Sequence, residues 1–144
     1  MKAVVARGGT SFKTEIHAGP HTFYADEPAE AGVVAAGPNP YELLLGALGA
    51  CTSMTLLLYA RRKGWPIEDV EVRLSHSRDY ARDCAECDER TTKLDVIERR
   101  IVLRGQLDEA QRTRLLEIAE KCPVHRTLTG RIKVNDRLEA EVHS

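Results

Sequence analysis

The sequence predicts an α+β fold in which mostly antiparallel strands pack on a long central helix and a second, shorter helix. Three observations predict it: loosely alternating apolar runs at both ends, one long apolar segment over 40–63, and the order strands, helix, strands, helix, strand. The chain has 144 residues. That is the usual size of one domain, so we expect a single domain over 1–144.

The N-terminal part is predicted to be a small β-meander. Residues 2–7 and 12–17 alternate around a Gly-Gly turn, and residues 21–25 look extended. Residues 26–40 are rich in Asp, Glu, Ala, Gly and Pro, which is typical of a loop. The loop leads into a helix start, because proline suits the first helical turn and an acidic residue there favours the positive end of the helix dipole.

The apolar segment 40–63 is predicted to be a helix that ends at Gly64, after three basic residues. Positions 43–60 hold 18 residues without a charge, which is the lower limit for a membrane span. Glycines and hydroxyl residues within it favour a helix buried in protein instead. A helix apolar on all sides must be covered all round, so we expect a homodimer and no membrane association.

Residues 67–75 and 94–103 alternate and are expected to pair as antiparallel strands. Between them, residues 77–93 carry nine charges in 17 positions and include a C-x-x-C pair. We expect this segment to be an exposed excursion at the tip of a hairpin.

The C-terminal part is predicted to hold the second helix and a last strand. Asp108 is a suitable cap for a helix over about 109–121, whose apolar positions form one stripe. Residues 131–142 alternate and are expected to be a strand, with a turn at Asn135-Asp136.

Composition limits the classes of function. Lys and Arg number 21 against 22 Asp and Glu, so the formal net charge is −1, unlike that of a chain that binds nucleic acid through a surplus of cations. The N-terminus shows no apolar signal segment, and we therefore expect a cytoplasmic protein with reduced thiols. The chain has four cysteines, too few for a disulfide scaffold at this length.

Cys51 and Cys122 each have a functional and a structural interpretation. Cys51 lies in the middle of the long helix, where it is either a small buried apolar side chain or a reactive thiol, and no cation is adjacent in sequence. Cys122 lies in Lys-Cys-Pro-Val-His-Arg, whose basic side chains favour a thiolate, whereas the expected helix C-terminus opposes one. His125 could also serve Cys122 as a base in acyl transfer.

Glu42 is the one acidic residue beside the apolar helix segment, and it is either a solvated helix charge or a carboxylate that orients a cation or a substrate oxygen. It precedes Cys51 by nine residues. On one helix the two would be about 13 Å apart along the axis and on opposite faces. They could meet only across two antiparallel copies of the helix, which again indicates a dimer.

Cys84 and Cys87 form a lone C-x-x-C, with His76 as the only imidazole nearby in sequence. They could hold zinc with ligands from elsewhere, exchange disulfides, or do neither.

The stretch 37–51, GPNPYELLLGALGAC, resembles the N-P-x-x-L…A-C signature of the OsmC/Ohr family of thiol peroxidases. Lys121-Cys122-Pro123 is similar to that family's second C-P motif, and about 70 residues separate the two cysteines, as in the family. The resemblance extends over nearly the whole chain. The charged excursion resembles a feature of one subgroup of the family.

The resemblance implies an intertwined homodimer with active sites at the interface, and a peroxidase that reduces organic hydroperoxides in oxidative-stress defence. It implies that Cys51 attacks the peroxide and becomes a sulfenic acid, that Cys122 then forms a disulfide with it, and that an external dithiol resets the pair. Glu42 is similar to a family carboxylate. No metal is required, and zinc at Cys84 and Cys87 belongs to the alternative, a non-catalytic member that binds a metal or small ligand.

The family also carries an arginine that pairs with the attacking thiolate. This sequence has no arginine between Arg7 and Arg61. The candidates to replace it are Arg7, Lys13 and Arg126.

Overall fold

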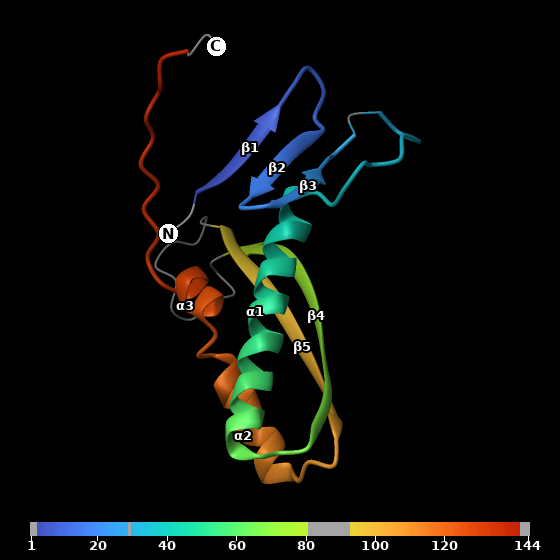
Figure 1. The fold of residues 1–144 in the computed structure, drawn as a ribbon, viewed down its shortest axis with the longest axis vertical. Coiled ribbons are helices and arrows are strands. Elements are labelled where there is room, and N and C mark those ends of the chain that lie inside the picture. Colours follow the sequence, from blue (N-terminus) through green and yellow to red (C-terminus); the bar gives the residue numbers. More distant parts are fainter. Residues whose placement is uncertain (1–2, 29, 81–92, 142–144) are drawn as a thin grey trace.

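The structure, a computed structural model, describes residues 3–28, 30–80 and 93–141 and has the predicted α+β architecture (Figure 1). Within these residues the strands form a three-stranded and a two-stranded antiparallel sheet. In chain order the elements are β1 (Val4–Gly8), β2 (Thr14–Ala18), β3 (His21–Ala25), α1 (Pro40–Lys63), β4 (Ile67–Tyr80), β5 (Lys93–Gly105), α2 (Glu109–Ala119) and α3 (Pro123–Thr129).

The N-terminal sheet is the predicted meander, with β2 between β1 and β3. It lies at the N-terminal end of α1 (Figure 1). All five residues of β1 are exposed, and in β3 only Ala25 is buried. The sheet therefore adds little to the core of this chain.

Helix α1 begins and ends as the sequence predicts. The Asn39 side chain accepts a hydrogen bond from the Glu42 backbone N–H (2.8 Å), and Glu42 Oε1 accepts one from the Asn39 N–H (2.9 Å). This reciprocal capping satisfies two backbone donors that a helix start leaves free. At the other end Gly64 has φ 71°, a left-handed conformation that suits glycine, and its N–H faces the carbonyls of Ala60 and Arg61.

Strands β4 and β5 pair along their whole length, from Ile67 opposite Gly105 to Tyr80 opposite Lys93. The predicted excursion therefore begins too early, because residues 77–80 continue β4. Charge alone is a poor sign of a loop here, since opposite charges can pair across two exposed strands, as Arg78 Nε does with Asp95 at 3.2 Å. Residues 81–92, with Cys84 and Cys87, lie outside the described residues.

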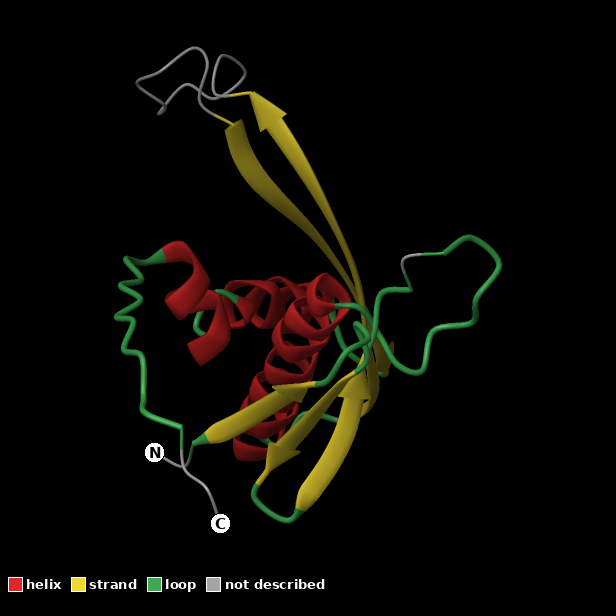
Figure 2. Cartoon of the chain, turned by 90° about the horizontal axis from the view of Figure 1, so that it is seen from above, coloured by secondary structure: helices red, strands yellow, loops and turns green. Residues whose placement is uncertain are grey.

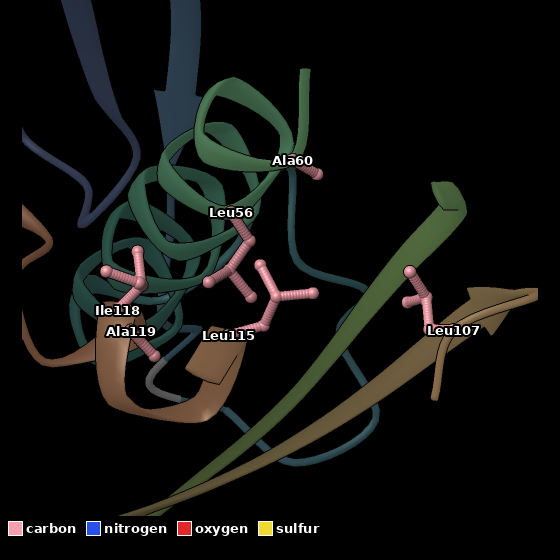
Figure 3. Packing of buried hydrophobic residues seen from close by; sticks show 6 residues of the cluster. All are labelled: Leu56, Ala60, Leu107, Leu115, Ile118 and Ala119. Carbon is pink, nitrogen blue, oxygen red and sulfur yellow. The ribbon is translucent and has the colours of Figure 1, made fainter. Parts of the chain in front are cut away.

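The core lies where α1 packs against α2 and the hairpin (Figure 3). Leu56 and Leu115 are fully buried and are joined by Ala60, Ile118, Ala119 and Leu107. Near Cys51, Gly49 lets α1 approach β4 closely, because a Cβ at this position would lie 2.9 Å from Leu74 Cδ1. Cys51 is thereby carried on a helix held firmly against the hairpin.

Helix α1 is covered on one face only. Its buried residues Leu48, Thr52, Leu56 and Ala60 recur every fourth position, whereas Met54 is 68% exposed. By length and composition the helix could cross a membrane, and 22% of its most apolar stretch is buried within the chain. A single chain therefore does not supply the all-round cover that the sequence predicts.

The C-terminal part differs from the prediction in two ways. Pro123 does not end the helical region but occupies the first position of α3, where proline is favoured because a first-turn N–H is unpaired in any case. Residues 131–141 were expected to form a strand, but they belong to no sheet in the described part of the chain. They run as an exposed, extended segment away from the helices (Figure 2). A strand requires a neighbour, and no described strand pairs with the segment.

Candidate functional site

Two free thiols meet where α1 packs against the junction of α2 and α3. Cys51 lies in the middle of α1 and is half-buried, and Cys122 lies between α2 and α3 with no exposed surface. The backbone holds Cys122 on both sides, because its N–H donates to the Ala119 carbonyl (3.3 Å) and its carbonyl accepts from the Arg126 N–H (3.0 Å). The two side chains form a hydrogen bond with each other.

The surroundings separate the two thiols in acidity. Burial raises the pKa of Cys51, and the hydrogen bond with Cys122 and the charge on Cys122 raise it further. Burial also opposes charge on Cys122, but hydrogen bonds from Cys51, from the backbone N–H groups of His125 and Val124, and from Thr52 lower its pKa. The first proton of the pair is therefore lost from Cys122. The hydrogen bond from Cys51 lowers the pKa of Cys122 most, and the backbone N–H groups at the start of α3 come next; the basic side chains near Cys122 in sequence are not among the causes.

Arg99 of β5 lies beside the pair, although our sequence analysis did not single it out. Its guanidinium donates to Thr52 Oγ1 (3.1 Å) and to His125 Nδ1 (3.1 Å). Along β5 its position has the same parity as Ile97 and Ile101, which line the same pocket. A charged residue at an inward position of a strand is the signal that could have identified it.

The cationic candidates from the sequence occupy other places. Arg7 belongs to β1, and Lys13 precedes β2, where its ammonium lies 4.6 Å from the centre of the Tyr24 ring. Arg126 is exposed on α3. In the described part of the chain, Arg99 is the cation that is hydrogen-bonded to the neighbour of Cys51 and to α3.

Glu42 caps the start of α1 and lies nine residues before Cys51 on the same helix. At the rise of an α-helix that separation is about 13 Å, so this chain does not bring Glu42 to its own Cys51. The structural alternative for Glu42, a helix-capping charge, describes its contacts here.

His125 does not serve Cys122 as a base in this arrangement. A guanidinium can only donate hydrogen bonds, so His125 Nδ1 must accept from Arg99. The contact of His125 with Cys122 is a hydrogen bond from its backbone N–H, not from its ring. The geometry therefore does not support the acyl-transfer hypothesis.

The zinc hypothesis concerns Cys84 and Cys87, which lie outside the described residues. His76, the imidazole nearby in sequence, binds Asp95 through Nε2 (2.8 Å) and stacks on Tyr41, with ring centres 4.7 Å apart. The described residues contain no group of three side chains that could hold a metal ion. The zinc site stays a prediction.

A pocket of about 480 Å³ lies beside Arg99 and His125. Its walls come from α1, β5, α2, α3 and the turn between α2 and α3, and apolar and polar side chains share them about equally. Asp95 and Glu120 also line it. Such a pocket suits a molecule with an apolar body and a polar group.

Together, the fold and the site define an α+β domain that carries a hydrogen-bonded dithiol on a long helix. The model of the OsmC-like protein family matches residues 32–136, which include both thiols. The chain therefore belongs to the OsmC-like protein family. A search of curated proteins finds no significant relative.

Solved structures share the fold. An OsmC-like protein from Mycoplasma pneumoniae matches with a TM-score of 0.71 at 19% identity, over 89% of this chain and 86% of that one. The organic hydroperoxide resistance protein OhrB of Bacillus subtilis matches with a TM-score of 0.62 at 23% identity, over 89% and 90%. An organic hydroperoxide resistance protein OsmC from Legionella pneumophila matches with 0.61 at 22%, over 89% and 88%.

Proposed function

We propose that this protein is a thiol-dependent peroxidase that reduces organic hydroperoxides in oxidative-stress defence, with Cys51 and Cys122 as its redox pair. The observation that carries the proposal is the hydrogen bond between these two thiols, which are 71 positions apart in sequence. The family and the likeness in fold to organic hydroperoxide resistance proteins support it.

In the proposed cycle Cys51 reacts first because it is the accessible sulfur, whereas Cys122 has no exposed surface. When the pair loses one proton, the charge is on Cys122, and the proton of the Cys51 thiol lies in the hydrogen bond between the two sulfurs. Transfer of that proton to Cys122 gives a Cys51 thiolate without a charge leaving the site. The reactive species is the monoanion of the pair, and its apparent pKa belongs to both thiols.

The Cys51 thiolate attacks the terminal oxygen of the hydroperoxide, the O–O bond breaks, and the alcohol leaves with the proton held by Cys122. Cys51 is then a sulfenic acid. The Cys122 thiolate then attacks the Cys51 sulfur, the S–O bond breaks, the leaving hydroxide takes a proton from solvent to become water, and a disulfide forms. An external dithiol reduces this disulfide and is itself oxidised. The cycle uses no metal or other cofactor.

The apolar part of the pocket wall, which includes Leu48, Ile97 and Leu128, favours an organic hydroperoxide over hydrogen peroxide, because the organic group can leave water for an apolar surface. Hydrogen peroxide is small and polar and gains nothing from such walls. We expect the protein to work in the cytoplasm, where dithiol reductants keep thiols reduced.

We also propose that the working molecule is a homodimer. The outer face of α1 is apolar and uncovered, with Met54 at 68% and Leu58 at 50% exposure. The extended segment 131–141 exposes Leu138 at 99% and pairs with no strand among the residues that the structure describes. A second copy would cover the helix and supply a neighbour for the segment, and it would allow Glu42 of one copy to approach Cys51 of the other.

Substitution of the accessible sulfur tests the proposed function. Cys51→Ser should abolish consumption of cumene hydroperoxide in the presence of a dithiol, because serine cannot form a sulfenic acid. Cys122→Ser should react once and retain a sulfenic acid that dimedone labels. Cys87→Ser is the matched control and should keep wild-type turnover. Consumption by Cys51→Ser at the wild-type rate would refute the proposal.

A further inference from the structure

Arg99 joins the two elements that carry the reactive sulfurs. One arm of its guanidinium binds Thr52, which follows Cys51 in α1, and another binds His125, three residues after Cys122 in α3. Each contact is 3.1 Å long. A planar guanidinium can hold two acceptors at a fixed separation, which a single ammonium group cannot do.

The partners of Arg99 are unusual for a half-buried cation. No ion pair joins Arg99 to a carboxylate within the described ranges 3–28, 30–80 and 93–141. Asp95 and Glu120 line the same pocket, but the two hydrogen bonds of Arg99 go to the Thr52 hydroxyl and to a ring nitrogen of His125. Its positive charge therefore has no carboxylate in direct contact, and Arg99 is linked to Cys122 through Thr52 and His125.

Thr52 links Arg99 to Cys122 through its side-chain hydroxyl. Its hydroxyl is fully buried, donates to the Leu48 carbonyl at 2.6 Å, and is also within hydrogen-bonding reach of the Cys122 sulfur. A hydroxyl has one proton, and with Arg99 on one lone pair that proton goes either to Leu48 or to Cys122. When Cys122 is charged, the thiolate is the stronger acceptor.

Arg99 is also linked to Cys122 through His125, at the first turn of α3. The backbone N–H groups of Val124 and His125 stabilise charge on Cys122, so the position of the first turn of α3 decides how well they do so. Arg99 anchors this turn to β5 through the His125 ring. Without Arg99, the Thr52 hydroxyl and the first turn of α3 would each lose a hydrogen bond that fixes their position.

We propose that Arg99 is a positioning residue that, through Thr52 and His125, holds the Cys122 sulfur against Cys51 and keeps it ready to ionise. The inference rests on the proposed function for its biological meaning. It concerns the dithiol itself, however, so it can be tested without a peroxide.

The experiment is a pH titration of the reduced protein by thiolate ultraviolet absorbance, in a Cys84→Ser, Cys87→Ser background so that only the pair contributes. In Arg99→Met we expect the first titration midpoint to move to higher pH. The thiolate fraction below the midpoint should fall about fivefold, the worth of one lost hydrogen bond. Arg99→Lys, which keeps the charge but not the planar fork, should lie between Arg99→Met and the parent.

Arg100→Met is the matched control, since Arg100 is the next residue on β5 and is exposed. It removes the same charge and should leave the titration unchanged. A parental midpoint in Arg99→Met, or an equal shift in Arg100→Met, would overturn the proposal. Should Arg99→Met fail to fold, Arg99→Lys decides, and a parental titration in it overturns the proposal.

Measuring hydroperoxide consumption distinguishes a failure of this inference from a failure of the proposed function. If the parent consumes no hydroperoxide, the peroxidase proposal fails while the titration still judges Arg99. In an active parent, Arg99→Met should slow closure of the disulfide after Cys51 is oxidised, and its sulfenic acid should persist longer.

Discussion

Two thiols that share a hydrogen bond cannot be described one at a time. The structure lowers the pKa of Cys122 and raises that of Cys51, and each thiol is among the causes of the other's shift. The two shifts have opposite signs because one sulfur accepts the hydrogen bond that the other donates. A substitution at either site must therefore move the titration of its partner.

This reciprocity gives a prediction at the residue scale. Cys51→Ala removes a donor to Cys122, so the pKa of Cys122 should rise and its thiolate should appear only at higher pH. Cys122→Ala should move the pKa of Cys51 downward, because the largest cause after burial is then absent. Thiolate absorbance against pH measures both midpoints, and Cys51→Ser, which keeps a donor, is the control. A titration midpoint of either cysteine that stays the same when the other is replaced by alanine would contradict the coupling.

At the same scale, the sequence identified both sulfurs but not their surroundings. Cys51 and Cys122 could be paired from two motifs at matched spacing, which is local information. For Arg99 the sequence offers only a charged residue in an otherwise apolar alternation, and its role depends on how β5 faces α1 and α3. The basic residues around Cys122 predict a lowered pKa, but in the structure the causes are the hydrogen bond from Cys51 and, after it, the backbone N–H groups of α3, a helix that the sequence does not predict.

Among the elements, α1 carries the site and α2 holds it in place. Leu115 of α2 is fully buried against the α1 face that includes Leu56 and Ala60. Arg112 secures the turn before α2, since its guanidinium donates to the carbonyls of Leu103, Gly105 and Leu107. Cys122 follows this helix directly, so the packing of α2 sets its position.

Leu115→Ala should lower the free energy of unfolding by about 2–5 kcal/mol, the usual cost of a cavity at a buried leucine. Its neighbour Leu116 is 62% exposed, and Leu116→Ala should cost about 1 kcal/mol or less. Urea unfolding at one fixed protein concentration measures both values. Equal costs for the two variants would show that α2 does not pack as described.

Elements with strong local signals could be predicted, and elements that depend on partners could not. The bounds of α1 follow from Asn39, Pro40 and Gly64, each of which acts within a turn of the helix end. Helix α3 was missed because Pro123 both ends one helix and begins the next. The strand expected over 131–142 has the alternation of a strand, but alternation does not supply a neighbour.

For the whole molecule, the uncovered face of α1 and the extended C-terminal segment lead to one prediction. Leu138→Asp should shift the proposed homodimer toward monomer by at least about tenfold in the dissociation constant, because a charge would replace an apolar side chain at the contact. Arg137→Ala is the control on the adjacent position. Sedimentation measures the dissociation constant, and a wild-type protein that is monomeric at working concentrations would contradict the dimer.

The central claim is that Cys51 and Cys122 act as one redox unit, and peptide mapping tests it most directly. Reduced protein is treated with one equivalent of cumene hydroperoxide, its remaining thiols are blocked, and the peptides are analysed by mass spectrometry without reduction. The account predicts a linked pair of peptides that contain Cys51 and Cys122, with Cys84 and Cys87 blocked as free thiols. Free Cys51 and Cys122, or a disulfide confined to Cys84 and Cys87, would contradict it.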